Sequence, residues 1–326
     1  MRMMNRRLYR PSKETFELAT KKLRAGNIVS FPTETVYGLG ADAKNNDAVA
    51  KIFAAKNRPN FNPLIVHLSG ANKASLYVKM CPLAQKLADN FWPGPFTMVL
   101  PLNEKSGLSD LITAGLNTVA IRVPKNDIAQ KLLHIFNGPI AAPSANKSGH
   151  VSPTTAAHVE SEFGAELEMI IDGGSCEKGI ESTIVQVENN SIILLRPGNV
   201  TAEDIKKATG HTVQIINQPT DNPIAPGQLK SHYAPNAQLR LNVTEPRTEE
   251  VYLAFGHTSH RGKSLNLSPS GDLTEAASNL FSMMRELDSN NVGIIAVAPI
   301  PNTGLGIAIN DRLARAAAPR DTKNDD

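Results

Sequence analysis

Four cationic side chains stand where they could bind a phosphate or a carboxylate. Lys56 and Arg58 lie at the end of a predicted helix, Arg122 interrupts the apolar run VAIRVP, and Arg196 ends the apolar run ILLR before Pro-Gly. A buried arginine is costly unless an anion accompanies it. Ligands of α/β sheets gather near strand ends, where Arg196 is expected. The pattern permits a site for an anionic ligand, although Lys56 and Arg58, taken alone, favour a structural explanation.

Each of these residues also has a purely structural explanation. Lys56 and Arg58 could complement the dipole at a helix C-terminus. Arg122 could form an ion pair with a carboxylate across the sheet. The sequence leaves these alternatives open.

Hydroxyl and amide side chains gather in two further stretches. The stretch APSANKSGHVSPT contains Ser144, Asn146 and Ser152, and GIESTIV contains Ser182. Such neutral donors and acceptors suit a ribose or a base, although the same residue types also form ordinary turns.

Several common chemistries lack their motifs. GLGADA fits G-x-G-x-x-A, but no acidic residue follows at the end of the next strand, so we expect these glycines to form a tight turn rather than a nicotinamide site. The chain contains neither a P-loop nor G-x-S-x-G. Cys81 and Cys176 lie far apart without a second ligand at metal spacing, which argues against a disulfide or zinc site. A nicotinamide oxidoreductase remains a rival function.

The elements that must position these residues alternate between helix and strand. Apolar spacing predicts helices over about 12–25, 46–57, 81–92, 127–136 and 155–164, with apolar strands between them. Hairpin-like spacing between ESTIVQVE and SIILLRPG predicts a mixed sheet. The predicted organisation is a catalytic domain over 1–215, a proline-rich linker over 216–236 and a small α/β domain over 237–326.

Composition and charge exclude other classes. The 326 residues are 41% hydrophobic, without an apolar run near the ~20 residues of a membrane helix. The N-terminus lacks the apolar centre of a secretory signal, so we expect a cytoplasmic protein. A net charge of +3 is too small to require a nucleic acid.

The order of the motifs is more specific than any one of them. SFPTETVYGLGADA, KNRPNFNPLIVH, WPGPFTMVL, VAIRVP, APSANKSG, GIESTIV and ILLRPG, in that succession, closely resemble the YrdC-like family over about residues 10–210. The linker APGQLKSHYAP and the final domain resemble the long, two-domain form of the family. The resemblance implies a twisted mixed sheet with helices and an open crevice, followed by a smaller Rossmann-like α/β domain.

The resemblance also implies a reaction. Members of the family join L-threonine, bicarbonate or CO2, and ATP into L-threonylcarbamoyl-adenylate, and pyrophosphate is released. Mg²⁺ would accompany ATP without a dedicated protein metal site. A separate tRNA threonylcarbamoyltransferase would take the product to adenosine 37 of tRNAs that read ANN codons, and neither a stable nucleic-acid complex nor a membrane is expected.

By the same resemblance, Lys56 and Arg58 are the catalytic residues. The residues implied for ATP are Arg58, Asn62, Thr118, Ser144, Asn146, Ser152, Arg196 and Tyr233. Those implied for threonine are Thr35, His67, Arg122, Ala142 and Ser182. The helix between Thr35 and Lys56 would carry the chain from the threonine side to the ATP side. The linker would close over the site, whereas the structural alternative is a plain tether too polar to join a core.

A rival from another class is an RNA-binding module. Phe31, Tyr37, Phe53 and Phe61 are interspersed with Lys and Arg. At an aromatic content of 5%, however, these residues fit core positions better than a base-stacking platform.

Overall fold

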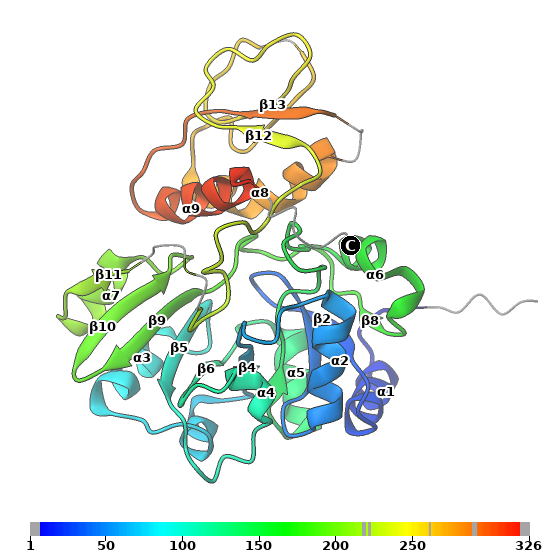
Figure 1. The fold of residues 1–326 in the computed structure, drawn as a ribbon, viewed down its shortest axis with the longest axis vertical. Coiled ribbons are helices and arrows are strands. Elements are labelled where there is room, and N and C mark those ends of the chain that lie inside the picture. Colours follow the sequence, from blue (N-terminus) through cyan, green and yellow to red (C-terminus); the bar gives the residue numbers. More distant parts are fainter. Residues whose placement is uncertain (1–6, 217–219, 221–222, 261, 289–291, 320–326) are drawn as a thin grey trace, which may run out of the picture.

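The computed structural model describes residues 7–216, 220, 223–260, 262–288 and 292–319. Within them the chain forms two α/β units, one above the other along the long axis (Figure 1). The larger unit is built on a mixed sheet with the strand order β1-β8-β2-β3-β7-β4-β6-β5-β9-β10-β11. The α/β class and the mixed sheet predicted from the sequence are confirmed.

The elements of the larger unit follow the predicted alternation. Its strands are β1 (Leu8–Tyr9), β2 (Val29–Pro32), β3 (Tyr37–Asp42), β4 (Ile65–His67), β5 (Phe96–Pro101), β6 (Thr118–Arg122), β7 (Ile140–Ala141), β8 (Ile170–Ile171), β9 (Thr183–Glu188), β10 (Ser191–Arg196) and β11 (Val213–Ile215). Its helices are α1 (Lys13–Arg24), α2 (Asn46–Lys56), α3 (Pro82–Phe91), α4 (Asp110–Thr113), α5 (Asp127–Phe136), α6 (Ala156–Phe163) and α7 (Ala202–Thr209), with 3₁₀ turns at Ala71–Leu76 and Gly164–Glu166.

Side-chain alternation gives the central strands two different faces. Val66, Ile121 and Val185 belong to the core cluster that contains buried residues of α2 and α3. Their neighbours on the opposite face form a second cluster with Ile224 and Ala225 of the linker. These neighbours are Ile65, Val99, Ala120, Ile184 and Leu195. The linker therefore covers the face of the sheet that the helices leave open.

The predicted glycine turn is wrong, because Gly38 and Gly40 lie inside strand β3, which pairs antiparallel with β2. A Cβ atom at Gly40 would stand 2.6 Å from Cε1 of Phe31 and 2.9 Å from Cγ2 of Ile140. The glycine therefore serves close packing between strands rather than a change of direction.

Strand β3 also changes the geometry predicted for the opening motif. The turn comes earlier, at Thr33, whose Oγ1 donates to the carbonyl of Val36 at 2.7 Å and accepts from the amide of Thr35 at 3.2 Å. β3 then leads away from this turn and α2 packs against it. The prediction that the helix alone connects the threonine side with the ATP side is therefore wrong. Strand β3 and helix α2 make this connection together.

The smaller unit has a four-stranded parallel sheet in the order β12-β15-β13-β14. Its elements are β12 (Gln238–Arg240), β13 (Val251–Ala254), β14 (Ser264–Asn266), α8 (Leu273–Asp288), β15 (Ile294–Val297) and α9 (Leu305–Ala317). Helices α8 and α9 lie between this sheet and the larger unit (Figure 1). The smaller C-terminal α/β domain predicted from the sequence is confirmed.

The two units share a continuous apolar core. Val36, Val151 and Ile180 of the larger unit belong to the same buried cluster as the residues of α8 and α9. Gly179 has a φ of +71°, and a Cβ atom there would stand 2.3 Å from the carbonyl oxygen of Ser278 in α8. Any larger residue at this position would push the units apart.

The linker contributes to the core where it is described, so the expectation that it is too polar to do so is wrong. Ala225 is fully buried and Tyr233 is 1% exposed. The Tyr233 ring stacks on Phe281 of α8, with 5.5 Å between the ring centroids. Residues 217–219 and 221–222 of the predicted linker, and 320–326 of the predicted last domain, lie outside the described residues.

The length and apolarity of a helix decide whether it can span a membrane. None of the helices in the described part of the chain is both long and apolar enough to cross a bilayer.

We predict that Gly40→Ala lowers the free energy of unfolding by about 1–3 kcal/mol, because its methyl group overpacks against Phe31 and Ile140. Urea unfolding followed by circular dichroism measures the change. Gly293→Ala is the control, because a Cβ atom at Gly293 meets none of the described atoms within 4 Å. Equal stabilities of the two variants would contradict the packing explanation.

Candidate active site

A small cavity lies where the β2–β3 turn, the ends of the central strands and the linker meet. Its water-accessible volume is about 40 Å³. It is lined by Thr35, His67, Arg122, Ala142 and Ser182, which were assigned to threonine, and by Arg58, Ser144, Arg196 and Tyr233, which were assigned to ATP. Residues from several strand ends and loops of the larger unit and from the linker therefore meet at one place.

Arg122 is the centre of the predicted threonine side. Its Nη2 donates to Oε1 of Glu34 at 2.6 Å, its Nη1 donates to Oγ1 of Thr35 at 3.0 Å, and its Nε donates to the carbonyl of Gly94 at 3.4 Å. These contacts use three of its five N–H groups, which leaves two for a planar carboxylate. The ion pair considered from the sequence exists, and the guanidinium still faces the cavity.

His67 lies beside Arg122 in neighbouring parallel strands. Burial, and then the positive charge of Arg122, lower the pKa of His67 to about 3. The ring is therefore neutral near pH 7, and its Nδ1 has no hydrogen-bond partner among the described residues. Ser182 shares a 2.8 Å hydrogen bond with Thr97. This side of the cavity thus offers neutral groups around one balanced ion pair.

The predicted ATP side has a different charge balance. Nζ of Lys56 donates to the carbonyls of Ser144, at 2.6 Å, and Asn146. Arg58 donates to the carbonyls of Asn62 and Pro63 at 3.1 and 2.8 Å.

Arg196 completes this set of cations. It donates to the Ser182 carbonyl at 3.0–3.1 Å and to the Pro226 carbonyl at 3.3 Å. No ion pair joins Lys56, Arg58 or Arg196 to a carboxylate within the described ranges. Three buried cations therefore rest on neutral oxygens.

Burial disfavours the charged forms of these cations. It lowers the pKa of Lys56 well below its usual value, and the neighbouring charge of Arg58 lowers it further. Burial lowers the pKa of Arg58 to about 9 and also lowers that of Arg196. An anion placed among them would favour all three charged forms.

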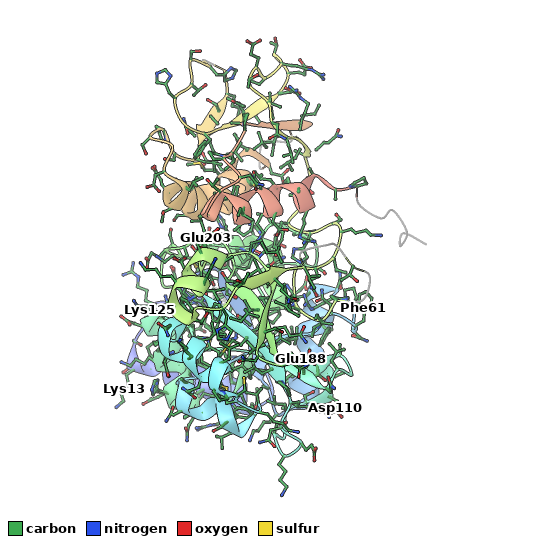
Figure 2. All side chains as sticks on the ribbon, turned by 90° about the vertical axis from the view of Figure 1, so that its left-hand side faces the viewer. Lys13, Phe61, Asp110, Lys125, Glu188 and Glu203 are labelled. Atoms are coloured by element: carbon green, nitrogen blue, oxygen red, sulfur yellow. The ribbon has the colours of Figure 1, made fainter. Side chains whose placement is uncertain are left out.

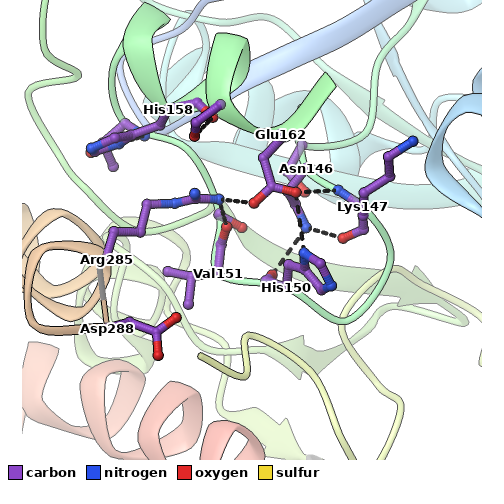
Figure 3. A network of polar contacts seen from close by, with 12 residues as sticks. Asn146, Lys147, His150, Val151, His158, Glu162, Arg285 and Asp288 are labelled. Atoms are coloured by element: carbon purple, nitrogen blue, oxygen red, sulfur yellow. Dashed lines mark hydrogen bonds and ion pairs between the residues drawn. The ribbon is translucent and has the colours of Figure 1, made fainter. Parts of the chain in front are cut away.

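The other predicted ATP residues do not line the cavity. Both side-chain polar atoms of Asn62 are buried without a partner among the described residues. Asn146 shapes its own loop by donating to the carbonyls of Lys147 and His150 at 2.7 and 3.0 Å (Figure 3). Oγ of Ser152 donates to Oε1 of Glu181 at 2.5 Å. Thr118 lies at the opposite end of β6 from Arg122, about 13 Å away at ~3.3 Å per residue.

Three further residues were not assigned a role from the sequence. Glu34 holds Arg122, Glu181 lines the cavity, and Arg312 of α9 donates to Oε2 of Glu181 at 2.9 Å. The sequence does contain a signal for Glu34, because this carboxylate lies next to Thr35 and a buried Arg122 needs an anion. No motif in the chain connects Arg312 with a site more than a hundred residues away.

The linker closes the cavity with Pro226, Gly227, His232 and Tyr233. A Cβ atom at Gly227, where φ is +87°, would stand 2.8 Å from the Tyr233 hydroxyl and 2.9 Å from Cδ of Arg196. Burial, followed by the charge of Arg58, lowers the pKa of His232 well below its usual value. The linker thus brings a neutral imidazole and a phenol against the cations.

Comparison with known proteins gives this arrangement a family. Residues 21–198 match the Sua5/YciO/YrdC family model, described as telomere recombination, and residues 200–318 match the model of the threonylcarbamoyl-AMP synthase C-terminal domain. The chain belongs to the threonylcarbamoyl-AMP synthase family.

Full-length relatives support this membership. Threonylcarbamoyl-AMP synthase of Pyrococcus abyssi is 40% identical over 93% of this chain and 94% of its own length. The Bacillus subtilis enzyme is 39% identical over 93% of this chain and 92% of its own. A crystal structure of P. abyssi Sua5 complexed with L-threonine matches with a TM-score of 0.88 and 37% identity, covering 95% of this chain and 97% of that one. Both domains are therefore family features.

We predict that His67 contributes an acid-sensitive part of the stability. Its folded pKa of about 3 lies below the unfolded value of 6.5, so the unfolded chain takes up the proton first as the pH falls. The contribution is complete above pH ~6.5 and is lost progressively toward pH ~3. Between these values the wild-type free energy of unfolding should fall more steeply than that of His67→Gln, by up to about 1.4 kcal/mol per pH unit.

Urea unfolding at a series of pH values, with both proteins in the same buffers, measures this difference. Parallel pH dependences of the two proteins would show that His67 is not held neutral.

Proposed function

We propose that this chain joins L-threonine, bicarbonate or CO2, and ATP into L-threonylcarbamoyl-adenylate, with release of pyrophosphate. This nucleotidyl transfer is the first step of N6-threonylcarbamoyladenosine formation at position 37 of tRNAs that read ANN codons. The observation that carries the proposal is a single cavity with a charge-balanced polar side and a side lined by Arg58 and Arg196, beside which Lys56 lies buried. None of these three cations has an ion-pair partner among the described residues. Its full-length relatives carry the name of this activity.

Charge determines how the site would act. The threonine amine adds to CO2 and loses a proton, which gives a carbamate. A carbamate oxygen then attacks the α-phosphorus of ATP, and the bond to the pyrophosphate oxygen breaks. Both reactants are anions, so their approach needs fixed positive charge. Lys56, Arg58 and Arg196 supply it by preorganised electrostatics.

The polar side suits an amino acid. Two N–H groups of Arg122 remain for the threonine carboxylate, and neutral His67 and Thr35 offer hydrogen bonds without a further charge. The P. abyssi structure complexed with L-threonine supports threonine as a substrate, and its assignment to this side rests on the charge balance.

The linker must move for ATP to enter. A volume of about 40 Å³ holds only a few water molecules. Thr118, Ala120 and Arg122 are alternate residues of β6, so they share the face of the sheet on which Ala225 packs. Displacement of the linker would expose Thr118 on the face expected to receive the nucleotide. Closure would then exclude water from a hydrolysable adenylate.

Mg²⁺ belongs to the proposal as a partner of ATP. The described residues contain no group of three or more His, Cys, Asp or Glu side chains that could hold a metal ion. Phosphate oxygens and water are ligands that Mg²⁺ prefers, and the bound ion would neutralise part of the phosphate charge.

The proposed product would pass to a separate tRNA threonylcarbamoyltransferase. The proposal includes the cytoplasm as the compartment, because ATP and tRNA are available there. No stable nucleic-acid complex is part of the proposal. Phe31, Tyr37 and Phe53 are buried and cannot stack on bases, whereas Phe61 is 52% exposed (Figure 2). One exposed ring gives the RNA-binding alternative little support.

We predict that the purified protein forms adenylate and pyrophosphate only when ATP, Mg²⁺, threonine and bicarbonate are all present. Chromatography of the nucleotide products, with each component omitted in turn, measures this requirement. Omission of threonine should reduce product to background, because the attacking carbamate cannot form. Untouched ATP in the complete mixture would contradict the proposed function.

A further inference from the structure

Helix α9 of the smaller unit carries a fully buried arginine that reaches the wall of the cavity. Nε of Arg312 donates to Oε2 of Glu181 at 2.9 Å, and its Nη1 donates to Oδ2 of Asp311 at 2.8 Å. Its guanidinium carbon lies 5.2 Å from the centroid of the Tyr233 ring. One side chain of the second domain thus contacts the catalytic unit and the linker together.

Both contacts of Arg312 lead to the nucleotide side. Glu181 lines the cavity, and its other carboxylate oxygen accepts from Ser152 at 2.5 Å. Tyr233 lines the same cavity from the linker. Ser152 and Tyr233 are both predicted ATP residues, although Arg312 does not line the cavity itself.

The next turn of α9 strengthens the hold on the linker. Nη1 of Arg315 donates to the carbonyl of Leu229 at 2.9 Å, and its own carbonyl accepts from the amide of His232 at 3.2 Å. Asp311 accepts from Arg315 at 3.0 Å as well as from Arg312. Helix α9 therefore holds the stretch that leads to Tyr233.

Helix α8 fixes the loop before Ser152 from its other side. Arg285 donates to the carbonyl of Val151, and to Oε1 of Glu162 at 2.7 Å (Figure 3). Oε2 of Glu162 in turn accepts from the amide of Lys147 at 3.0 Å. The loop that contains Asn146 and Ser152 is thus held from both helices of the smaller unit.

We propose that Arg312 is a positioning residue for the nucleotide, acting through Glu181 on Ser152 and through its own guanidinium on Tyr233. The inference rests on the proposed function, because it assigns the C-terminal domain to the ATP side of that site. An ion pair that only docks the two domains is the competing explanation. A positioning role predicts that loss of Arg312 weakens nucleotide binding but not threonine binding. A docking role alone predicts no such difference between the two ligands.

The test measures two dissociation constants of the full chain by calorimetry. The probes are L-threonine and an ATP analogue with a methylene group between the α- and β-phosphorus atoms. Arg312→Met should weaken binding of the analogue by about tenfold or more, as expected for the loss of a charged hydrogen bond that orients its site. Threonine affinity should stay within about twofold of wild type.

Arg240→Met is the matched control. Arg240 lies in the same domain and pairs with the buried Glu250 through two contacts of 2.7 and 2.5 Å, but neither residue lines the cavity. This variant should lose stability while keeping both dissociation constants. An equal effect of Arg240→Met on nucleotide binding would overturn the inference.

Two further variants test whether an effect of Arg312→Met comes from lost positioning of the nucleotide site, from unfolding, or from loss of the positive charge. Arg312→Met leaves Glu181 without its guanidinium, which is strongly destabilising for a buried pair. Arg312→Met with Glu181→Gln removes both charges, and it should remain folded yet bind the analogue weakly. Arg312→Lys keeps the charge but not the planar fork, so it should restore less than half of the lost affinity.

Unchanged analogue binding in Arg312→Met, equal losses for both ligands, or full recovery by lysine would overturn the positioning role. Failure of the proposed function has a different signature. A wild-type protein that binds the analogue without ever forming adenylate would refute the reaction, while the affinities would still report on Arg312.

Discussion

Positive charge buried without an ion-pair partner is the constraint on which the described part of this structure depends. Lys56, Arg58 and Arg196 are buried, and each rests on backbone carbonyls. Carbonyl dipoles offset only part of the cost of removing a cation from water. The surrounding chain is shaped to supply these dipoles: Asn57, in the left-handed conformation, ends α2 between Lys56 and Arg58. An anionic ligand would offset the remaining cost.

On the side of the cavity that contains Arg122, by contrast, the charges balance. Arg122 is balanced by Glu34, and His67 is held neutral, so this side carries no net charge. A zwitterionic amino acid also carries no net charge, whereas ATP is strongly anionic. In the proposed function, this difference in charge would direct the two substrates to different ends of one cavity. Helices α8 and α9 add further support, because they fix the loop and the linker that border the cationic end of the cavity.

Much of this arrangement could be predicted from the sequence, and the failures have physical causes. Helices such as 127–136 carry strong apolar periodicity and an Asn126 cap, so they were predicted correctly. The turn predicted at Gly38 and Gly40 is wrong because the sequence does not distinguish a glycine in a turn from a glycine that packs beneath a neighbouring ring.

The ordered motifs indicated most cavity residues, but Arg312 lies in another domain without a local pattern. The polar composition of the linker predicts that it stays outside the core, but two of its apolar or aromatic residues, Ala225 and Tyr233, are buried and determine its packing.

The most direct test is a calorimetric titration of the purified protein with pyrophosphate, at low and at moderate salt. If the buried cations form an anion site, pyrophosphate binds without adenosine or threonine, and its affinity falls as salt rises. Arg196→Met should weaken this binding by about tenfold or more, whereas Arg122→Met, which alters the charge-balanced side, should leave it nearly unchanged. Absence of pyrophosphate binding, or equal losses in the two variants, would contradict the account.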